Sequence, residues 1–216
     1  MVCCCTATDS GGIGRFFSRF ARRYASRYRR KGLEATQKQL VAGLAAQGFQ
    51  GRSLLDIGCG VGYLHHELLR LGARSAVGVD LSEAQLAEAR EEALRAGLSA
   101  RTDYRLGDFE DVAADIAPAD ITLLDKVICC YPDARGLVER AVAHSGALCA
   151  LTVPRGHVLN RVLARIATGV LWLTRSAYRP FVHEPGMLDV WIRKAGFEKV
   201  YEARTPVWLT RIYQRL

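Results

Sequence analysis

The hydrophobic positions of this chain change their spacing several times, and each change predicts a new element. Over residues 13–30, aromatic and aliphatic side chains recur every three or four positions, which is typical of an amphipathic helix with a basic opposite face. A second helix is predicted over residues 33–47. From residue 53 onward, short apolar runs alternate with helical patterns, several of which end at glycine. This β-α-β-α-β rhythm predicts a parallel sheet covered by helices on both faces.

The boundaries of these elements follow from the same spacing. Strands are predicted over 53–57, 75–80, 102–108, 120–128 and 146–154, and helices over 62–72, 82–97 and 134–144. After Pro154 the rhythm stops. The later patterns predict helices over 157–175 and 186–195, followed by closing strands over 197–203 and 207–215. We therefore divide the chain into a helical, basic and aromatic arm (1–48) and one globular domain (49–216).

The charge of the chain is concentrated in the arm. The whole sequence is 50% hydrophobic and 24% charged, an ordinary globular composition, with a net charge of +8. Residues 1–32 hold eight Arg or Lys side chains against Asp9 alone, so the remainder is nearly neutral. Such an arm could contact nucleic acid, anionic lipid or an acidic substrate, or form a solvated helix face. Its Arg and Ser content also resembles an organellar transit peptide, whereas the apolar run of a secretory signal is missing.

Two further features bound the class of protein. The longest apolar stretch, near 157–173, contains Arg161 and Arg165 and is too charged for a membrane span. The seven cysteines form no framework of spaced pairs, which favours reduced thiols, a cytoplasmic location and no zinc site.

A glycine-rich loop follows the first predicted strand. In "LLDIGCGVG" (54–62), Gly58, Gly60 and Gly62 would let the backbone approach a ligand closely. Alone, this pattern could also belong to a dinucleotide-binding fold. Asp56, however, stands two residues before the first glycine, where a carboxylate disfavours phosphate and favours a cationic, amino-acid-like ligand.

Two more acids end the next two strands. Asp80 closes the second strand, about twenty residues after the loop, where it could accept hydrogen bonds from ribose hydroxyls. Asp108 closes the third strand and is followed by Phe109. A carboxylate there could accept from an adenine amine while the ring covers the base.

This ordered series resembles the class I S-adenosylmethionine-dependent methyltransferases over roughly residues 50–155. The resemblance implies an α/β, Rossmann-like, mostly parallel sheet of seven strands whose last strand is antiparallel, with S-adenosylmethionine as cofactor. An unrelated Rossmann domain, or a fold that binds the cofactor without catalysis, is the alternative. The implied cofactor-binding residues are Asp56, Gly58, Cys59, Gly60, Gly62, Asp80, Leu81, Asp108, Phe109 and Asp125.

Within the class, the chain is more weakly similar to the magnesium-protoporphyrin O-methyltransferase group. The shared features are an aromatic and basic N-terminal helix, "GCGVG", and a closing strand like "VWLTRIYQ". That group has a histidine just before the tyrosine that follows strand four, whereas this chain has Cys130. In this fold the open surface lies over the cofactor, so we expect the aromatic arm to act as a lid.

The segment "VICCYPD" (127–133) directly follows strand four and should border the acceptor pocket. Cys129 and Cys130 are either small buried hydrophobes or soft ligands, with one of Cys3 to Cys5 brought over by the arm. The second interpretation resembles the chemistry of arsenite methyltransferases, whose overall pattern this chain does not match. Cys149 and Cys59 are expected to be structural.

Methyl transfer from a sulfonium needs positioning and desolvation, and a base only for hydroxyl or ammonium acceptors. Base candidates are Tyr131, His157, Asp133 and His183, whereas His65 and His66 are expected to be structural or exposed. The catalytic candidates are Cys130, Tyr131 and His157.

The sequence therefore predicts a methyltransferase acting on a small-molecule acceptor. One alternative is an enzyme that methylates a thiol or metalloid through the cysteines; another is a nucleic-acid-associated methyltransferase that uses the basic arm. Nucleic acid is the less favoured partner, and weak contact with a membrane surface through 13–30 and 157–175 is a further alternative.

Overall fold

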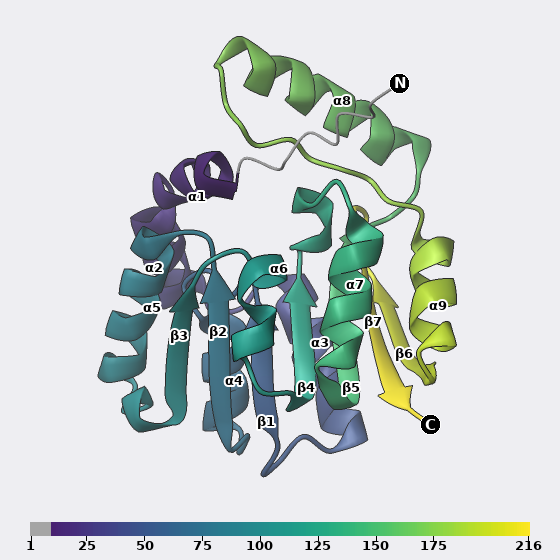
Figure 1. The fold of residues 1–216 in the computed structure, drawn as a ribbon. Coiled ribbons are helices and arrows are strands. Elements are labelled where there is room, and N and C mark those ends of the chain that lie inside the picture. The colour runs from purple at the N-terminus through teal and green to yellow at the C-terminus, as the bar shows by residue number, and fades with distance from the viewer. Residues whose placement is uncertain (1–9) are drawn as a thin grey trace.

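Short apolar runs separated by helices build one sheet of seven strands in the computed structural model, which describes residues 10–216 (Figure 1). The strand order is β3-β2-β1-β4-β5-β7-β6. The strands are β1 (Ser53–Ile57), β2 (Ser75–Asp80), β3 (Thr102–Leu106), β4 (Ala119–Asp125), β5 (Ser145–Pro154), β6 (Phe197–Arg204) and β7 (Trp208–Arg215).

The direction of the strands divides the sheet into two parts. The strands β1 to β5 pair in parallel, whereas β7 is antiparallel to both β5 and β6. The chain order reverses between β1 and β4, and the carboxyl ends of the strands at such a reversal form a ligand-binding crevice. The predicted seven-stranded, mostly parallel sheet is confirmed.

Two apolar clusters hold helices to the two faces of the sheet. One cluster joins the strands to α3 (Ala35–Gln47), α4 (Tyr63–Arg70) and α5 (Glu83–Arg95). The other joins them to α6 (Phe109–Val112), α7 (Ala134–Ala143) and α9 (Pro185–Lys194). Fully buried side chains on both faces explain why the central strands are apolar without alternation.

The N-terminal segment has a different organisation from the single helix predicted over 13–30. Two helices, α1 (Ser10–Ser18) and α2 (Ala21–Lys31), are separated by a turn at Arg19 and Phe20. The three- to four-residue spacing of the aromatic side chains continues across this turn, so the spacing alone could not reveal it.

Helix α3 was grouped with the arm by its position in the sequence, but it packs on the sheet. Its Leu40 and Leu44 are completely buried. A Cβ added at Gly43 would lie 2.5 Å from Ile212 Cδ1, so this helix lies directly against β7. Within the predicted arm, α1 and α2 are therefore the part that is separate from the sheet-bound core.

The segment after β4 is not the strand predicted up to residue 128. The strand ends at Asp125, Lys126 adopts a left-handed φ of 61°, and Ile128–Cys130 form a short 3₁₀ turn, η3. Helix α8 (Val158–Leu173) follows β5 and stands apart from the sheet (Figure 1). Within residues 10–216, no helix combines the length and hydropathy that a membrane span needs.

Candidate functional site

The glycine loop after β1 uses its own amides to hold its shape. The amides of Cys59 and Gly62 donate to Val79 O and Cys59 O, both at 3.0 Å. The amide of Gly60 donates to Asp80 Oδ2 at 2.8 Å. A phosphate-binding loop would instead direct such amides at its ligand. The loop is therefore a rigid wall and not an anion cradle, which agrees with the interpretation of the sequence.

Gly58 shows why the loop requires glycine at its first position. Its φ is +66°, and a Cβ there would lie 2.6 Å from Val127 Cγ2. Any side chain would combine backbone strain with a clash against the segment that leaves β4. Because Gly58 has no side chain, the ends of β1 and β4 can lie side by side. Gly62 lies at the start of α4 as its N-cap.

Asp80 links the loop to the end of β2. Its two carboxylate oxygens accept from the amides of Gly60, at 2.8 Å, and Ser82, at 2.9 Å. Each oxygen keeps a second lone pair, so the group can still accept from a ligand hydroxyl. Burial raises the pKa of Asp80 to about 6, and the carboxyl group is therefore ionised at pH 7.

Asp56 has a protein partner that the sequence did not reveal. Its Oδ2 lies 2.7 Å from His65 Nδ1, and both side chains are buried. Burial raises the pKa of Asp56 to about 8 and lowers that of His65 to about 3. The pair consequently carries no net charge at pH 7. Asp56 lines the cavity but does not offer a free carboxylate to a cationic ligand, unlike the expectation from its place before the loop.

His65 and His66 lie beneath the loop and are fully buried. The Nε2 atom of His66 lies 2.6 Å from the hydroxyl of Tyr104 on β3. These histidines support the loop from behind, and neither lines the cavity.

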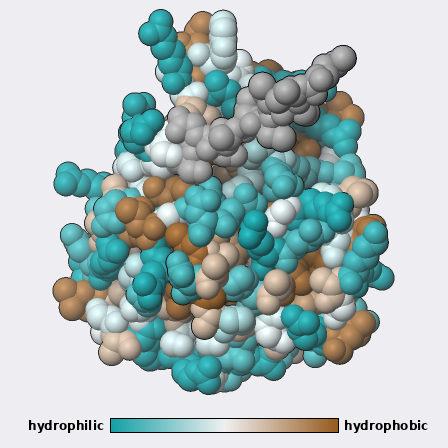
Figure 2. All heavy atoms as spheres, viewed as in Figure 1, coloured by the Kyte–Doolittle hydropathy of each residue, from teal (hydrophilic) through white to brown (hydrophobic). Residues whose placement is uncertain are grey.

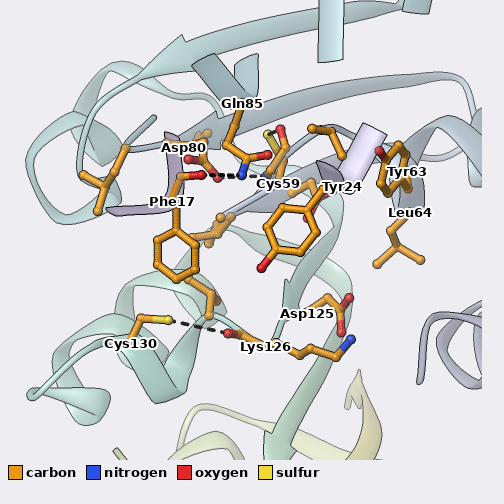
Figure 3. Close-up of a pocket in the computed structure, with 18 of the residues that line it drawn as sticks. Phe17, Tyr24, Cys59, Tyr63, Leu64, Asp80, Gln85, Asp125, Lys126 and Cys130 are labelled. Atoms are coloured by element: carbon orange, nitrogen blue, oxygen red, sulfur yellow. Dashed lines mark hydrogen bonds between the residues drawn. The ribbon is translucent and has the colours of Figure 1, made fainter. Parts of the chain in front are cut away.

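A cavity of about 360 Å³ opens where β1, β2 and β4 end (Figure 3). Its wall includes most of the predicted cofactor residues: Asp56, Gly58, Cys59, Gly60, Asp80, Leu81, Phe109 and Asp125. Cys130 and Tyr131 line it as well. The structure therefore brings residues from four strand ends around one space, as the switch-point rule predicts.

The same cavity is lined by residues that the sequence analysis did not select. Figure 3 shows Tyr24 between the side bearing Asp80 and Gln85 and the side bearing Asp125 and Lys126. The additional lining residues include Ile13, Phe17, Tyr24, Arg27, Glu34, Gln37, Tyr63, Gln85, Lys126 and Trp208. Lys126 could have been found from its position just after β4, whereas only the fold brings in Trp208 from β7.

Helix α1 approaches the loop after β2 very closely. A Cβ at Gly14 would lie 2.3 Å from the backbone oxygen of Leu81. Gln85 Nε2 donates to Phe17 O at 3.1 Å, and the hydroxyls of Ser18 and Ser82 are 2.8 Å apart. These contacts hold α1 against the cofactor side of the cavity.

Buried acceptors line the cavity and indicate the kind of ligand that fits. Among the described residues, Gln85 Oε1 is buried without a hydrogen-bond partner, and Asp125 is a buried carboxyl near the hydroxyl of Thr152 on the paired strand. Burial also raises the pKa of Asp125. Buried acceptors of this kind need donors from a ligand. S-adenosylmethionine carries an ammonium group, ribose hydroxyls and an adenine amine, so the residues present fit this cofactor.

A capping box orients Asp125. The backbone amide of Glu34 donates to Gln37 Oε1, and Gln37 Nε2 donates to Asp125 Oδ2, both at 3.1 Å. The sequence "EATQ" (34–37) gave only part of the signal, because Gln37 stands at the usual third position but Glu34 replaces the usual Ser or Thr at the N-cap. Its contact with β4 needed the fold.

The structure joins Asp108 and Tyr131, which the sequence analysis assigned to different roles. The hydroxyl of Tyr131 donates to Asp108 Oδ1 at 2.7 Å, and the same oxygen accepts from the amide of Glu110 at 3.1 Å. Burial and the Asp108 charge raise the pKa of Tyr131. Its phenol therefore stays protonated and is a poor general base. Phe109 lines the cavity, whereas Asp108 lies behind it.

Cys130 lies at the cavity wall, with its Sγ 3.7 Å from Lys126 O and 3.9 Å from the hydroxyl of Tyr178. A hydrogen bond from Cys129 lowers the pKa of Cys130, while the same bond and burial raise the pKa of Cys129. Cys149 is buried in β5, as expected. Among residues 10–216, no group of three His, Cys, Asp or Glu side chains could hold a metal ion. Cys3 to Cys5 lie outside the described residues.

The remaining base candidates do not reach the cavity. His157 is exposed at the N-cap of α8, so the structure does not support it as a catalytic residue. Asp133 caps α7 by accepting from the amide of Gly136 at 3.0 Å. His183 Nε2 donates to Tyr131 O at 2.8 Å. Sequence position after a strand could not distinguish these exposed or capping roles from a catalytic one.

The glycine loop held to β2, the acid at the end of β2 and the buried acceptors of the cavity fit the cofactor end of a class I S-adenosylmethionine-dependent methyltransferase. Known proteins agree with this assignment. A family described as "Methyltransferase domain" matches residues 54–145. The chain belongs to the S-adenosylmethionine-dependent methyltransferases, which confirms the fold, the family and the cofactor expected from the sequence.

Relatives with assigned activities include two bacterial enzymes named ubiquinone biosynthesis O-methyltransferase. The Xylella fastidiosa protein is 32% identical over 177 residues, covering 74% of this chain and 68% of its own. The Pseudomonas aeruginosa (strain LESB58) protein is 30% identical over 158 residues, covering 70% and 66%. The chain thus spans about two thirds of the length of these curated relatives.

Among solved structures, magnesium protoporphyrin IX methyltransferase from Synechocystis PCC 6803, with bound S-adenosylhomocysteine, has a similar fold. The TM-score is 0.72 at 19% identity, with 96% of this chain and 100% of that chain covered. At this identity the likeness concerns the fold.

The position of Asp80 predicts a measurable loss of cofactor binding. In Asp80→Asn the charged acceptor is lost, so affinity for S-adenosylmethionine should weaken by about 1–3 kcal/mol, as measured by calorimetry. Asp103→Asn, an exposed carboxylate on the neighbouring strand β3, is the matched control and should bind normally. Wild-type affinity should also decrease as the pH falls through about 6, where Asp80 becomes protonated, and the decrease should be smaller in the Asn variant. Equal affinity of both variants at pH 7 would place the ribose elsewhere.

Proposed function

We propose that this protein transfers a methyl group from S-adenosylmethionine to an oxygen atom of a small, acidic, aromatic acceptor. The observation that carries the proposal is that Arg27 and Lys126 line the same cavity as the cofactor residues and share a single carboxylate, Glu34. When bound, the cofactor supplies an electrophilic methyl group for in-line displacement.

The charges at this end of the cavity favour an anionic acceptor. Arg27 Nη1 lies 3.1 Å from Glu34 Oε1, and Lys126 Nζ pairs with Glu34 Oε2. Lys126 also lies near the Asp125 carboxyl, whose pKa burial raises. When Asp125 is protonated, two cations face the single carboxylate of Glu34, and a positive excess remains at this end. A phenolate or carboxylate on the acceptor would balance it, and charge-assisted hydrogen bonds from Arg and Lys are stronger than neutral ones.

Backbone strain at Lys126 supports a functional role for this residue. Its φ of 61° is unusual for a residue with a side chain, and such conformations cost on the order of 1–3 kcal/mol. The conformation directs the turn out of β4 and brings the ammonium group to 5.6 Å from the centre of the Trp208 ring. A strained residue at the wall of a binding cavity is a common feature of functional sites.

Aromatic side chains give the acceptor end flat walls. Phe17 and Tyr24 come from the arm and Trp208 from β7, and all three line the cavity. Tyr178 stacks on Phe16 with ring centroids 4.9 Å apart. Rings of this kind favour a planar acceptor through offset stacking and exclude water.

The titratable groups also fit an acidic acceptor. None of the cavity-lining residues in the described part of the chain is a histidine. An acceptor that is already ionised at pH 7 needs no general base. The names of the two bacterial relatives, both O-methyltransferases, support an oxygen acceptor and a small molecule.

We further propose that α1 and α2 form the lid expected from the sequence, because they supply Phe17, Tyr24 and Arg27 to the cavity.

Gly14→Ala should move α1 off Leu81, since the new Cβ would have to occupy space 2.3 Å from a backbone oxygen. Cofactor affinity should decrease at least fivefold, roughly 1 kcal/mol, in calorimetry. The control Gly169→Ala places a Cβ in open space on α8 and should change nothing. Normal cofactor affinity in Gly14→Ala would contradict the lid. Alanine stabilises a helix relative to glycine, so a loss of affinity could not come from unfolding of α1.

The acceptor itself can be found with labelled cofactor and a panel of acidic phenols, aromatic carboxylates, neutral catechols and thiols. We expect turnover of acidic aromatic compounds. In Arg27→Met, kcat/KM for the acidic acceptor should fall about three- to tenfold, in line with a partly exposed ion pair worth roughly 1 kcal/mol. Arg23→Met, an exposed arginine of the same helix outside the cavity, should retain wild-type kinetics. Turnover of neutral compounds alone, or an unchanged Arg27 variant, would overturn the proposal.

A second candidate, methylation of a thiol or a soft metalloid acceptor, is favoured by the place of Cys130 at the cavity wall. If this thiol meets the acceptor, Cys130→Ser should preserve cofactor affinity and lower turnover at least tenfold, about 1.4 kcal/mol of barrier. Cys149→Ser, buried in β5, is the control for general effects of the exchange. Wild-type turnover in Cys130→Ser with every active acceptor would leave the oxygen acceptor as the better assignment.

A further inference from the structure

Helix α8 presents an apolar side to solvent over its whole length. In a helix of this size a folded protein normally buries one stripe, yet within α8 only Asn160 is buried. Val158, Trp172 and Leu173 have exposed fractions of 74%, 71% and 78%. The other exposed apolar side chains are Leu159, Val162, Leu163, Ile166 and Val170.

These side chains gather on one side of the helix, and arginines border them. At 3.6 residues per turn, Val158, Val162, Ile166 and Val170 follow one another along the helix, with Leu159 and Leu163 beside them. Arg161 and Arg165 lie along one edge of this stripe. In Figure 2, brown apolar atoms lie beside teal hydrophilic ones at the top of the molecule, where Figure 1 draws α8.

The charge around α8 has one sign. Residues 155–183 contain five arginines and neither Asp nor Glu. Arg161 pairs with Glu184 at 2.7 Å, whereas Arg165 and Arg175 have no acidic partner in the described part of the chain. Arg179 donates to the backbone oxygens of Ser176 and Tyr178.

The start of α8 and the segment that follows the helix are fastened to the body. At its start, Asn160 Nδ2 donates to Arg155 O at 2.9 Å and to Val207 O at 2.8 Å. After its end, the amide of Phe181 donates to Cys129 O at 2.8 Å, next to the cavity wall. The first turn of α8 is therefore held to the body, and the segment after the helix contacts the turn that bears Cys130.

We propose that α8 docks on an anionic lipid surface, with its apolar stripe in the interface and its arginines at the headgroups. Apolar residues on one side, arginines at the edge, and a Trp near the end are the features of an interfacial helix. Unpaired arginines without neighbouring acids fit a negatively charged leaflet. A second copy of the chain is a poorer occupant, because a twofold contact would bring the same arginines towards each other.

Vesicle flotation tests this docking with the full chain. Wild-type protein should float with mixed phosphatidylcholine–phosphatidylglycerol vesicles and much less with phosphatidylcholine alone, and added salt should weaken the binding. In Ile166→Glu/Val170→Glu, the amount of lipid needed for half-maximal binding should rise at least tenfold. Leu94→Glu, the same kind of change at an exposed leucine on α5, is the matched control and should bind as wild type does.

Cofactor affinity, measured on each variant, should stay at the wild-type value, which shows that the double variant is folded and separates this test from the proposed reaction. Three results would overturn the docking: no binding of wild-type protein to anionic vesicles, equal binding by the double variant, or wild-type dimers in sedimentation that the double variant converts to monomers without any vesicle binding.

Discussion

The carboxylate of Asp80 carries the geometry of the cofactor end. It accepts from the amide of Gly60 with one oxygen and from the amide of Ser82 with the other. It therefore fixes the glycine loop to the end of β2, and it also holds Ser82, the N-cap residue of α5. The loop can then remain a bare backbone wall, because its amides have partners. A buried carboxylate with two amide donors and free lone pairs is also well suited to a ligand hydroxyl. One interaction thus serves the fold and the binding site together.

Beneath the glycine loop, the buried Asp56–His65 pair carries no net charge. The Asp56–His65 pair shares one proton, and His66 contacts Tyr104 on β3. If Asp56 were an isolated anion in this buried position, its desolvation would be costly. The pair avoids this cost and leaves the net charge of the cavity to residues on its rim. Arg27, Lys126 and Glu34 line the same cavity as Asp80 and Asp125, and the proposed acceptor preference rests on these three charges.

The N-terminal helices and α8 all lie outside the sheet-bound core, but they differ in their relation to the cavity. Helix α1 is held by the close approach of Gly14 to Leu81 and contributes side chains to the cavity. Helix α8 contributes none, and its apolar side faces solvent. Tyr178, which follows α8, nevertheless touches both Phe16 of the arm and Cys130 of the wall. Tyr178 therefore links the segment after α8 to the arm and to the cavity wall.

The sequence by itself determined the family, the sheet and the loop, because Asp56, the three glycines, Asp80 and Asp108 are local signals that occur in order along the chain. Strand direction and the switch point followed from the same rhythm. Only the tertiary structure decided which side chains are free to act. His157 and Tyr131 both follow strand ends in the sequence, yet one is exposed and the other donates to Asp108. Trp208, Arg27 and Lys126 meet only after β7 and the arm have folded over β4, since contacts between residues far apart in the chain depend on packing and not on local spacing.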